Sequence, residues 1–100
     1  MTSKKKKKLD QQTVSLKKVV FTPHAWEDYT YWASSSPKIT IRINELINDA
    51  QRSLNQGIGK PEKLSGDLKG YYSRRIDQEN RLVYTVLNGN LVIVQARYHY

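Results

Sequence analysis

The spacing of apolar residues changes at Gly57, and this change constrains the fold more than any other feature. Before Gly57 the apolar residues fall on one face of a helix: Ile39, Ile43, Leu46, Ile47, Ala50 and Leu54. Because glycine commonly ends helices, we expect this helix to end near Gly57. Beyond a turn-rich loop at 57–70, three segments read as strands: 71–76, 81–87 and 91–100. The turns expected between them lie at 77–80 and at 88–90, where Asn-Gly favours a tight hairpin.

The residues before this helix predict another helix and a short strand. Thr22-Pro23 and Ser36-Pro37 each combine a capping hydroxyl with a proline, which is favoured at a first helical position. The first of these helices has a predicted apolar stripe of Ala25, Trp26, Tyr29, Trp32 and Ala33. Residues 16–21 are predicted to form a β-strand. The expected class is α+β, with an N-terminal strand and a two-helix hairpin packed on a C-terminal antiparallel sheet.

One face of that sheet is expected to stay free of helices. Alternation along the last strand divides it into an apolar side and a polar side. We expect the helices to cover Val92, Val94, Ala96 and Tyr98. The free face would then carry Gln95, Arg97 and His99.

Positive charge is concentrated at the start of the chain. Residues 1–18 hold seven lysines and one acid, which leaves ten basic and eight acidic residues, a net +2, for the rest. We therefore expect a disordered basic tail at 1–16 and a single domain at 17–100. The tail could bind RNA or the ribosome, or it could be an expression tag or a wrongly chosen start. Within the domain the basic excess lies in residues 57–100, with seven bases against four acids.

Several classes of site are excluded or disfavoured. The chain has no cysteine, which removes disulfides and cysteine nucleophiles and fits a reducing, cytoplasmic location. It has no apolar stretch of membrane-span length, and its two histidines lack metal-ligand spacing. No serine elbow or phosphate-loop motif is present.

The remaining candidates suit RNA cleavage: Glu62, Arg74, Arg75, Arg81, Arg97, His99 and the tyrosines. Attack by a ribose 2′-hydroxyl on the neighbouring phosphorus needs a base, an acid and positive charge on the phosphoryl oxygens. No metal or cofactor is required. The alternative interpretation is that these charged residues form an ordinary solvated face.

The motifs "AWEDYTYW", "INELINDA", "GKPEKL", "YYSRRI", "RLVYTV" and "ARYHY" resemble, in order and spacing, the YoeB-type toxins. These toxins are a branch of the RelE-like ribonucleases of bacterial toxin–antitoxin modules. The resemblance runs from about Lys18 to Tyr100. It implies a RelE-like fold and a toxin that enters the ribosomal A site and cuts mRNA. It also implies a YefM-like antitoxin whose disordered C-terminal segment folds over the toxin, and it leaves a homodimer possible.

Carried onto this chain, the resemblance makes Glu62 the general base, His99 the general acid and Arg81 the phosphate ligand. Tyr100 would position the scissile nucleotide, so the chain would end in its own active site. The expected RNA contacts are Arg75, Arg74, Arg97, Lys63 and Lys69. Ser65 stands where members of the family often have a base.

Two other functions stay open. A ParE-like relative would share the fold and bind its target without cleaving RNA, but the presence of Glu62, Arg81 and His99 argues against it. The basic tail favours a small basic ribosomal protein, but the net charge of only +2 on the rest of the chain disfavours it.

Overall fold

The computed structural model describes residues 16–99, so residues 1–15 and Tyr100 lie outside the described part. The predicted tail at 1–16 is therefore outside it except for Leu16. Leu16 is half-buried and packs against the hydrophobic core. The domain thus includes at least one residue more than the predicted range 17–100.

Two helices form the predicted hairpin. Helix α2 spans Pro23–Ser35 and helix α3 spans Pro37–Arg52. Thr22 caps α2, because its Oγ1 accepts a hydrogen bond from the N–H of Ala25 at 3.1 Å. Ser36 ends α2 and also caps α3 through a bond from Ile39, so the hairpin turn is a single residue.

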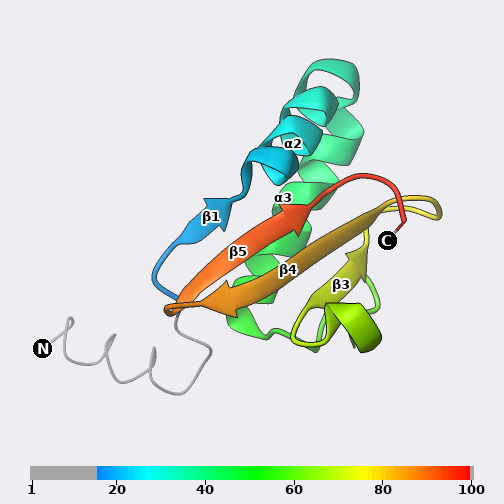
Figure 1. The fold of residues 1–100 in the computed structure, drawn as a ribbon. Helices are drawn as coiled ribbons and strands as arrows, with labels where there is room; N and C mark the ends of the chain where they lie inside the picture. The colour runs from blue at the N-terminus through cyan, green and yellow to red at the C-terminus, as the bar shows by residue number, and fades with distance from the viewer. Residues whose placement is uncertain (1–15, 100) are drawn as a thin grey trace, which may run out of the picture.

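The strands form one five-stranded mixed sheet in the order β1-β5-β4-β3-β2. Their bounds are β1 Val19–Phe21, β2 Glu62–Lys63, β3 Tyr72–Arg75, β4 Arg81–Leu87 and β5 Asn90–Gln95. Strand β1 runs parallel to β5, and the other neighbours are antiparallel. The predicted meander is confirmed, and β1 extends it on one side (Figure 1).

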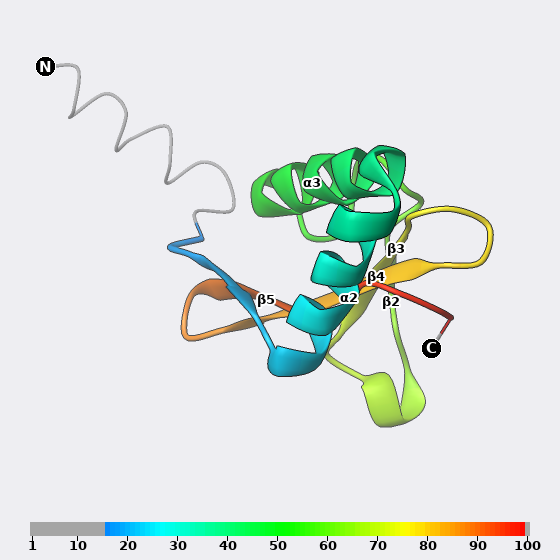
Figure 2. The same ribbon diagram turned by 90° about the horizontal axis from the view of Figure 1, so that it is seen from above.

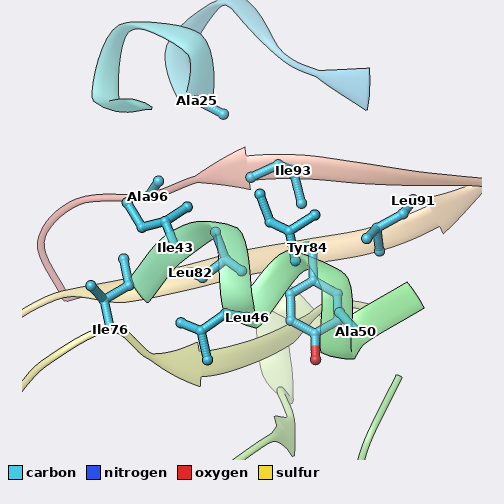
Figure 3. Packing of buried hydrophobic residues seen from close by; sticks show 11 residues of the cluster. Ala25, Ile43, Leu46, Ala50, Ile76, Leu82, Tyr84, Leu91, Ile93 and Ala96 are labelled. Atoms are coloured by element: carbon cyan, nitrogen blue, oxygen red, sulfur yellow. The ribbon is translucent and has the colours of Figure 1, made fainter. Parts of the chain in front are cut away.

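The core lies between α3 and one face of the sheet. The fully buried residues Ile43, Leu46 and Ala50 of α3 pack against residues of β4 and β5: Leu82, Tyr84, Leu91 and Ile93 (Figure 3). Helix α2 adds Ala25. The 3₁₀ turn Gly66–Leu68 and the C-terminal segment lie on the opposite side of the sheet from α3 (Figure 2). The predicted apolar face of α3 is confirmed.

The predicted facing of β5 is wrong over most of its length. Leu91 and Ile93 face the core, and Val92 and Val94 do not. The register shifts at a β-bulge, where Val94 is the extra residue between the two pairs Tyr84–Ile93 and Val83–Gln95. The bulge inverts the alternation beyond it, so that Ala96 is buried as predicted.

Three other local predictions need correction. Residues 57–70 are not all loop, because Glu62 and Lys63 form β2. The last strand ends at Gln95 instead of continuing to the end of the chain, and Tyr98 is 58% exposed instead of packing on the helices. On α2, Trp26 is 53% exposed, and a carboxylate, Asp28, takes a buried position.

Candidate active site

Three predicted site residues lie on the face of the sheet that the helices leave open. Leu82 faces the core, so its neighbour Arg81 points to the opposite face. Arg75 is the cross-strand partner of Arg81 and shares that face. Glu62 pairs with Ser73, which lies two residues before Arg75 on β3. A carboxylate and two guanidinium groups therefore belong to one surface formed by β2, β3 and β4.

Arg81 is held by the turn that precedes its strand and is only 7% exposed. Its Nη1 donates hydrogen bonds to the carbonyl oxygens of Asp77 at 2.9 Å, Asn80 at 3.1 Å and Gln78 at 3.3 Å. These bonds fix the Arg81 guanidinium beside the turn at 77–80, at the start of β4.

The end of the chain returns alongside Arg81. The N–H of Arg81 donates to the carbonyl oxygen of Tyr98 at 2.9 Å. The N–H of Tyr98 donates to Oδ1 of Asn80 at 2.6 Å. Tyr98 has a φ of +67°, a left-handed conformation that few non-glycine residues adopt. This backbone places the exposed His99 directly after the residue that is bonded to Arg81. Tyr100 lies outside the described residues.

The same segment is fixed to helix α2 through Ala96. Its N–H donates to Oδ2 of the buried Asp28 at 3.0 Å, and its carbonyl oxygen accepts from Nε1 of Trp32 at 2.8 Å. No local sequence pattern indicates this role for Asp28, because its partner is a backbone group 68 residues away.

Arg97, predicted to bind phosphate, stacks on aromatic rings. Its guanidinium carbon lies 3.6 Å from the ring centre of Tyr31 and 4.6 Å from that of Tyr98. A guanidinium group in this position is held by cation–π attraction. Arg97 therefore attaches the C-terminal segment to α2, and the structure does not place it with Glu62 and Arg75.

The prediction that Arg74 binds RNA phosphate is wrong, because its side chain is fully buried on the helix-facing side of β3. Its Nη1 pairs with Oδ2 of Asp49, and its Nε donates to the hydroxyl of Tyr84 at 2.8 Å. The guanidinium also donates to carbonyl oxygens of the loop that follows α3: Ser53, Gln56 and Ile58. None of this side chain can reach a ligand on the open face.

Asp49 completes this buried cluster. Its carboxylate also accepts the N–H of Ile58 at 2.8 Å and pairs with Arg52 at 2.6 Å. The hydrogen bond from Ile58, together with the two arginines, lowers the pKa of Asp49 from 3.8 to about 2, against the opposing effect of burial. The cluster fixes the loop that leads to Lys60 and Glu62.

The two predicted lysine contacts lie on the edge strand β2 and in the loop before β3. Lys63 pairs with Tyr72, whose ring stacks on Tyr84 of the core, so its side chain starts on the opposite face from Glu62. Lys69 is exposed beside Gly70, and the carbonyl oxygen of Gly70 accepts a hydrogen bond from Thr85 on β4 at 2.8 Å. Lys69 is thus at the end of the open face that lies away from Arg81.

Residues 16–99 contain no group of three His, Asp or Glu side chains placed to bind a metal ion. Neither helix described by the structure is long and apolar enough to cross a membrane.

Comparison with known proteins shows the family of this chain. The sequence profile described as "YoeB-like toxin of bacterial type II toxin-antitoxin system" matches residues 21–100. The chain belongs to this family. Toxin YoeB of Streptomyces coelicolor is 59% identical over 83 residues, which cover 83% of this chain and 99% of the relative. The resemblance drawn from the motifs is confirmed, and the protein is a toxin of a type II toxin–antitoxin system.

Solved structures of YoeB proteins have the same fold. A YoeB/ParE toxin from Agrobacterium tumefaciens superposes with a TM-score of 0.80 at 42% identity, covering 84% of this chain and 100% of that one. YoeB of Staphylococcus aureus, solved as a dimer, gives a TM-score of 0.77 at 48% identity, covering 83% and 97%. Its complex with YefM gives 0.76 at 48% identity, covering 85% and 98%. The predicted RelE-like α+β class is confirmed.

Proposed function

We propose that this YoeB-family toxin is an endoribonuclease that cleaves mRNA in the ribosomal A site and so inhibits translation. The ribose 2′-hydroxyl attacks the adjacent phosphorus, and Glu62 accepts its proton. The bond from phosphorus to the 5′-oxygen breaks, and His99 donates a proton to that oxygen. The products are a 2′,3′-cyclic phosphate and a free 5′-hydroxyl, and the reaction uses no metal or cofactor.

The cationic side chains act on the phosphoryl group. The guanidinium of Arg81 would bind its non-bridging oxygens, where negative charge increases in the transition state. Arg75, the cross-strand partner of Arg81, would bind the substrate backbone beside it. Tyr100 would position the scissile nucleotide, while Lys63 and Lys69 would contact RNA at the edges of the face.

The observation that carries this proposal is the position of the segment that leads to His99. Glu62, Arg75 and Arg81 share the open face of the sheet, and the backbone that precedes His99 is hydrogen-bonded to Arg81. The residues proposed as base and phosphate ligand therefore share one face, and the backbone that leads to the proposed acid is bonded beside them. A toxin that only binds its target has no need of this arrangement.

We further propose a YefM-like antitoxin as partner, with a disordered C-terminal segment that folds over the toxin. The Staphylococcus aureus relative has been solved with YefM and as a dimer, so a homodimer of this chain is also proposed. Both partners and the mRNA substrate fit a cytoplasmic protein.

Cleavage of mRNA on programmed ribosomes tests the catalytic roles. Glu62→Gln and His99→Gln should each lower the single-turnover rate by about 10²- to 10⁴-fold, the usual contribution of a general acid or base. Both variants should still bind the antitoxin, because neither residue belongs to the core. Lys18→Gln, an exposed change beside β1, is the control with an unchanged rate. Growth inhibition without cleavage by the wild type would instead support a ParE-like binding toxin.

A further inference from the structure

A second hollow lies next to the candidate active site, at the end of β3. It has a volume of about 370 Å³ and lies between α3, the loop before β2 and the turn after β3. Its lining consists of Arg42, Gly59, Lys60, Arg75, Ile76, Asp77 and Gln78. Neither Arg42 nor Lys60 was singled out by the sequence or used in the proposed mechanism.

The carboxylate that lines the hollow, Asp77, is hydrogen-bonded within its own turn. Oδ1 of Asp77 accepts the N–H groups of Glu79 at 2.9 Å and Asn80 at 2.7 Å, and both its oxygens contact the Asn80 amide. These bonds direct the Asp77 carboxylate toward the turn that follows β3.

Arg42, Lys60 and Arg75 line the hollow together with a single acid, Asp77, so its lining carries a net positive charge. Like charges gathered around one hollow repel each other, and a bound anion would relieve that repulsion.

The backbone at Lys60 is held in an unusual conformation. Its φ is +50°, although the residue is not glycine and precedes Pro61, which restricts its backbone further. The conformation is fixed from the preceding residue, because Gly59 accepts a hydrogen bond from the N–H of Arg75 at 2.7 Å. Residues held in sparsely populated conformations occur preferentially at functional sites. The loop thus presents Lys60 next to Arg75 in a fixed arrangement.

Arg75 connects the hollow to the open face, because it lines the hollow and is the cross-strand partner of Arg81. An RNA strand whose scissile phosphate lies at Arg81 would therefore continue toward Arg42 and Lys60. We propose that Arg42 and Lys60, together with Arg75, bind a phosphodiester of the same RNA strand next to the scissile one. This inference rests on the proposed ribonuclease function.

Binding of a single-stranded oligoribonucleotide with 2′-O-methyl groups tests the proposal, since the blocked hydroxyl prevents cleavage. The full chain and its R42Q/K60Q variant would be titrated by fluorescence anisotropy over a range of NaCl concentrations. Each lost phosphate contact should reduce the slope of log Kd against log salt by about 0.7, the value for single strands. Lys18→Gln, which removes one charge at the opposite edge of the sheet, is the matched control. The proposal fails if the double variant and this control have the same slope.

Two further measurements separate lost phosphate binding from a packing defect and from a failure of the ribonuclease proposal. Arg42→Lys retains the charge and should retain most of the affinity, which guards against a packing defect at the half-buried Arg42. On programmed ribosomes the double variant should have a higher KM than the wild type and a similar kcat. This is the result expected when a lost contact stabilised the bound substrate and the transition state equally. If the wild type cleaves and the double variant matches it in both constants, only the phosphate subsite is refuted. If the wild type does not cleave, the ribonuclease proposal fails. The slope of log Kd against log salt still shows whether Arg42 and Lys60 bind an RNA phosphate.

Discussion

Nη1 of Arg74 lies 2.5 Å from Oδ2 of Asp49, so a fully buried guanidinium on β3 is paired with a carboxylate on α3. The pair joins the sheet to the helix and, through the carbonyls that Arg74 also binds, to the loop between α3 and β2. That loop leads directly to Glu62. The geometry of the proposed base thus depends on a charge pair that never contacts substrate.

Removing Arg74 should be severely destabilising. Arg74→Met removes one cation from the Asp49 carboxylate and the donor to three loop carbonyls, and breaking a buried pair from one side typically costs about 3–5 kcal/mol. Urea denaturation measures this loss. Arg75→Met, the adjacent and exposed change, is the control and should cost less than about 0.5 kcal/mol. Equal losses in the two variants would contradict the buried role of Arg74.

The low pKa of Asp49 predicts acid sensitivity. Its value of about 2 in the folded state lies below the ordinary 3.8, so ionised Asp49 stabilises the fold above that ordinary value. This contribution should decrease as the pH falls from about 5 toward 2, where the folded state is also protonated. Unfolding midpoints measured across this range should fall more steeply for the wild type than for Asp49→Asn. If the unfolding midpoints of the two proteins fall in parallel with pH, Asp49 is not the source of the acid sensitivity.

Two glycines with positive φ offer a matched test of the close packing at Asp49. A Cβ at Gly57, where φ is +115°, would overlap the Asp49 carboxylate, whereas a Cβ at Gly66, where φ is +63°, meets nothing within 4 Å. Gly66→Ala should cost about 1–2 kcal/mol from backbone strain alone. Gly57→Ala should cost more, because the carboxylate must also move. Chemical denaturation of the two variants compares them, and a smaller loss at Gly57 would refute the predicted overlap.

Truncation after Tyr98 should abolish RNA cleavage and leave the stability of the fold nearly unchanged. The variant loses His99 and Tyr100 but keeps the bonds of Ala96 to α2 and of Tyr98 to Arg81. We expect no cleavage on programmed ribosomes and a shift in Tm below about 4 °C, which corresponds to less than 1 kcal/mol. Retained cleavage would remove His99 from the mechanism.

Deleting residues 1–15 tests whether the lysines of the tail take part in catalysis. They should add salt-dependent affinity for RNA without contributing to the reaction. The truncated protein keeps Leu16, which packs on the core, and should cleave at the wild-type rate when substrate is saturating. A large fall in that single-turnover rate would assign the tail to the mechanism.

The sequence predicted the parts of the fold that depend on local pattern. The apolar face of α3 and the Asn88-Gly89 turn follow from spacing and backbone preference, and Asn88 and Gly89 indeed have φ values of +54° and +77°. The prediction from sequence failed where the burial of a residue depended on the register between strands. Arg74 and Arg75 are adjacent and identical in type, and only their pairing with Leu82 and Arg81 buries the first and exposes the second.

The bulge at Val94 and the buried carboxylates could not be predicted for the same reason. Val92 and Val94 have the same β-branched character as Ile93, so alternation alone does not show which side packs. Asp28 and Asp49 look like ordinary helix-surface residues until partners 68 and 25 residues away are known. The motif resemblance supplied the candidate roles of Glu62 and His99, which no local pattern would have assigned.

The parallel pairing of β1 with β5 has a consequence for how the protein is made. Val20 pairs with Val92, so the first strand to leave the ribosome finds its neighbour only when the last strand has been synthesised. Contacts this distant in sequence form slowly, and until then β1 has no partner in the sheet. Ala96 and Tyr98, which fix the end of the chain beside Arg81, are made later still. A nascent chain of this toxin therefore cannot assemble its proposed catalytic face until the residues up to Tyr98 have been synthesised.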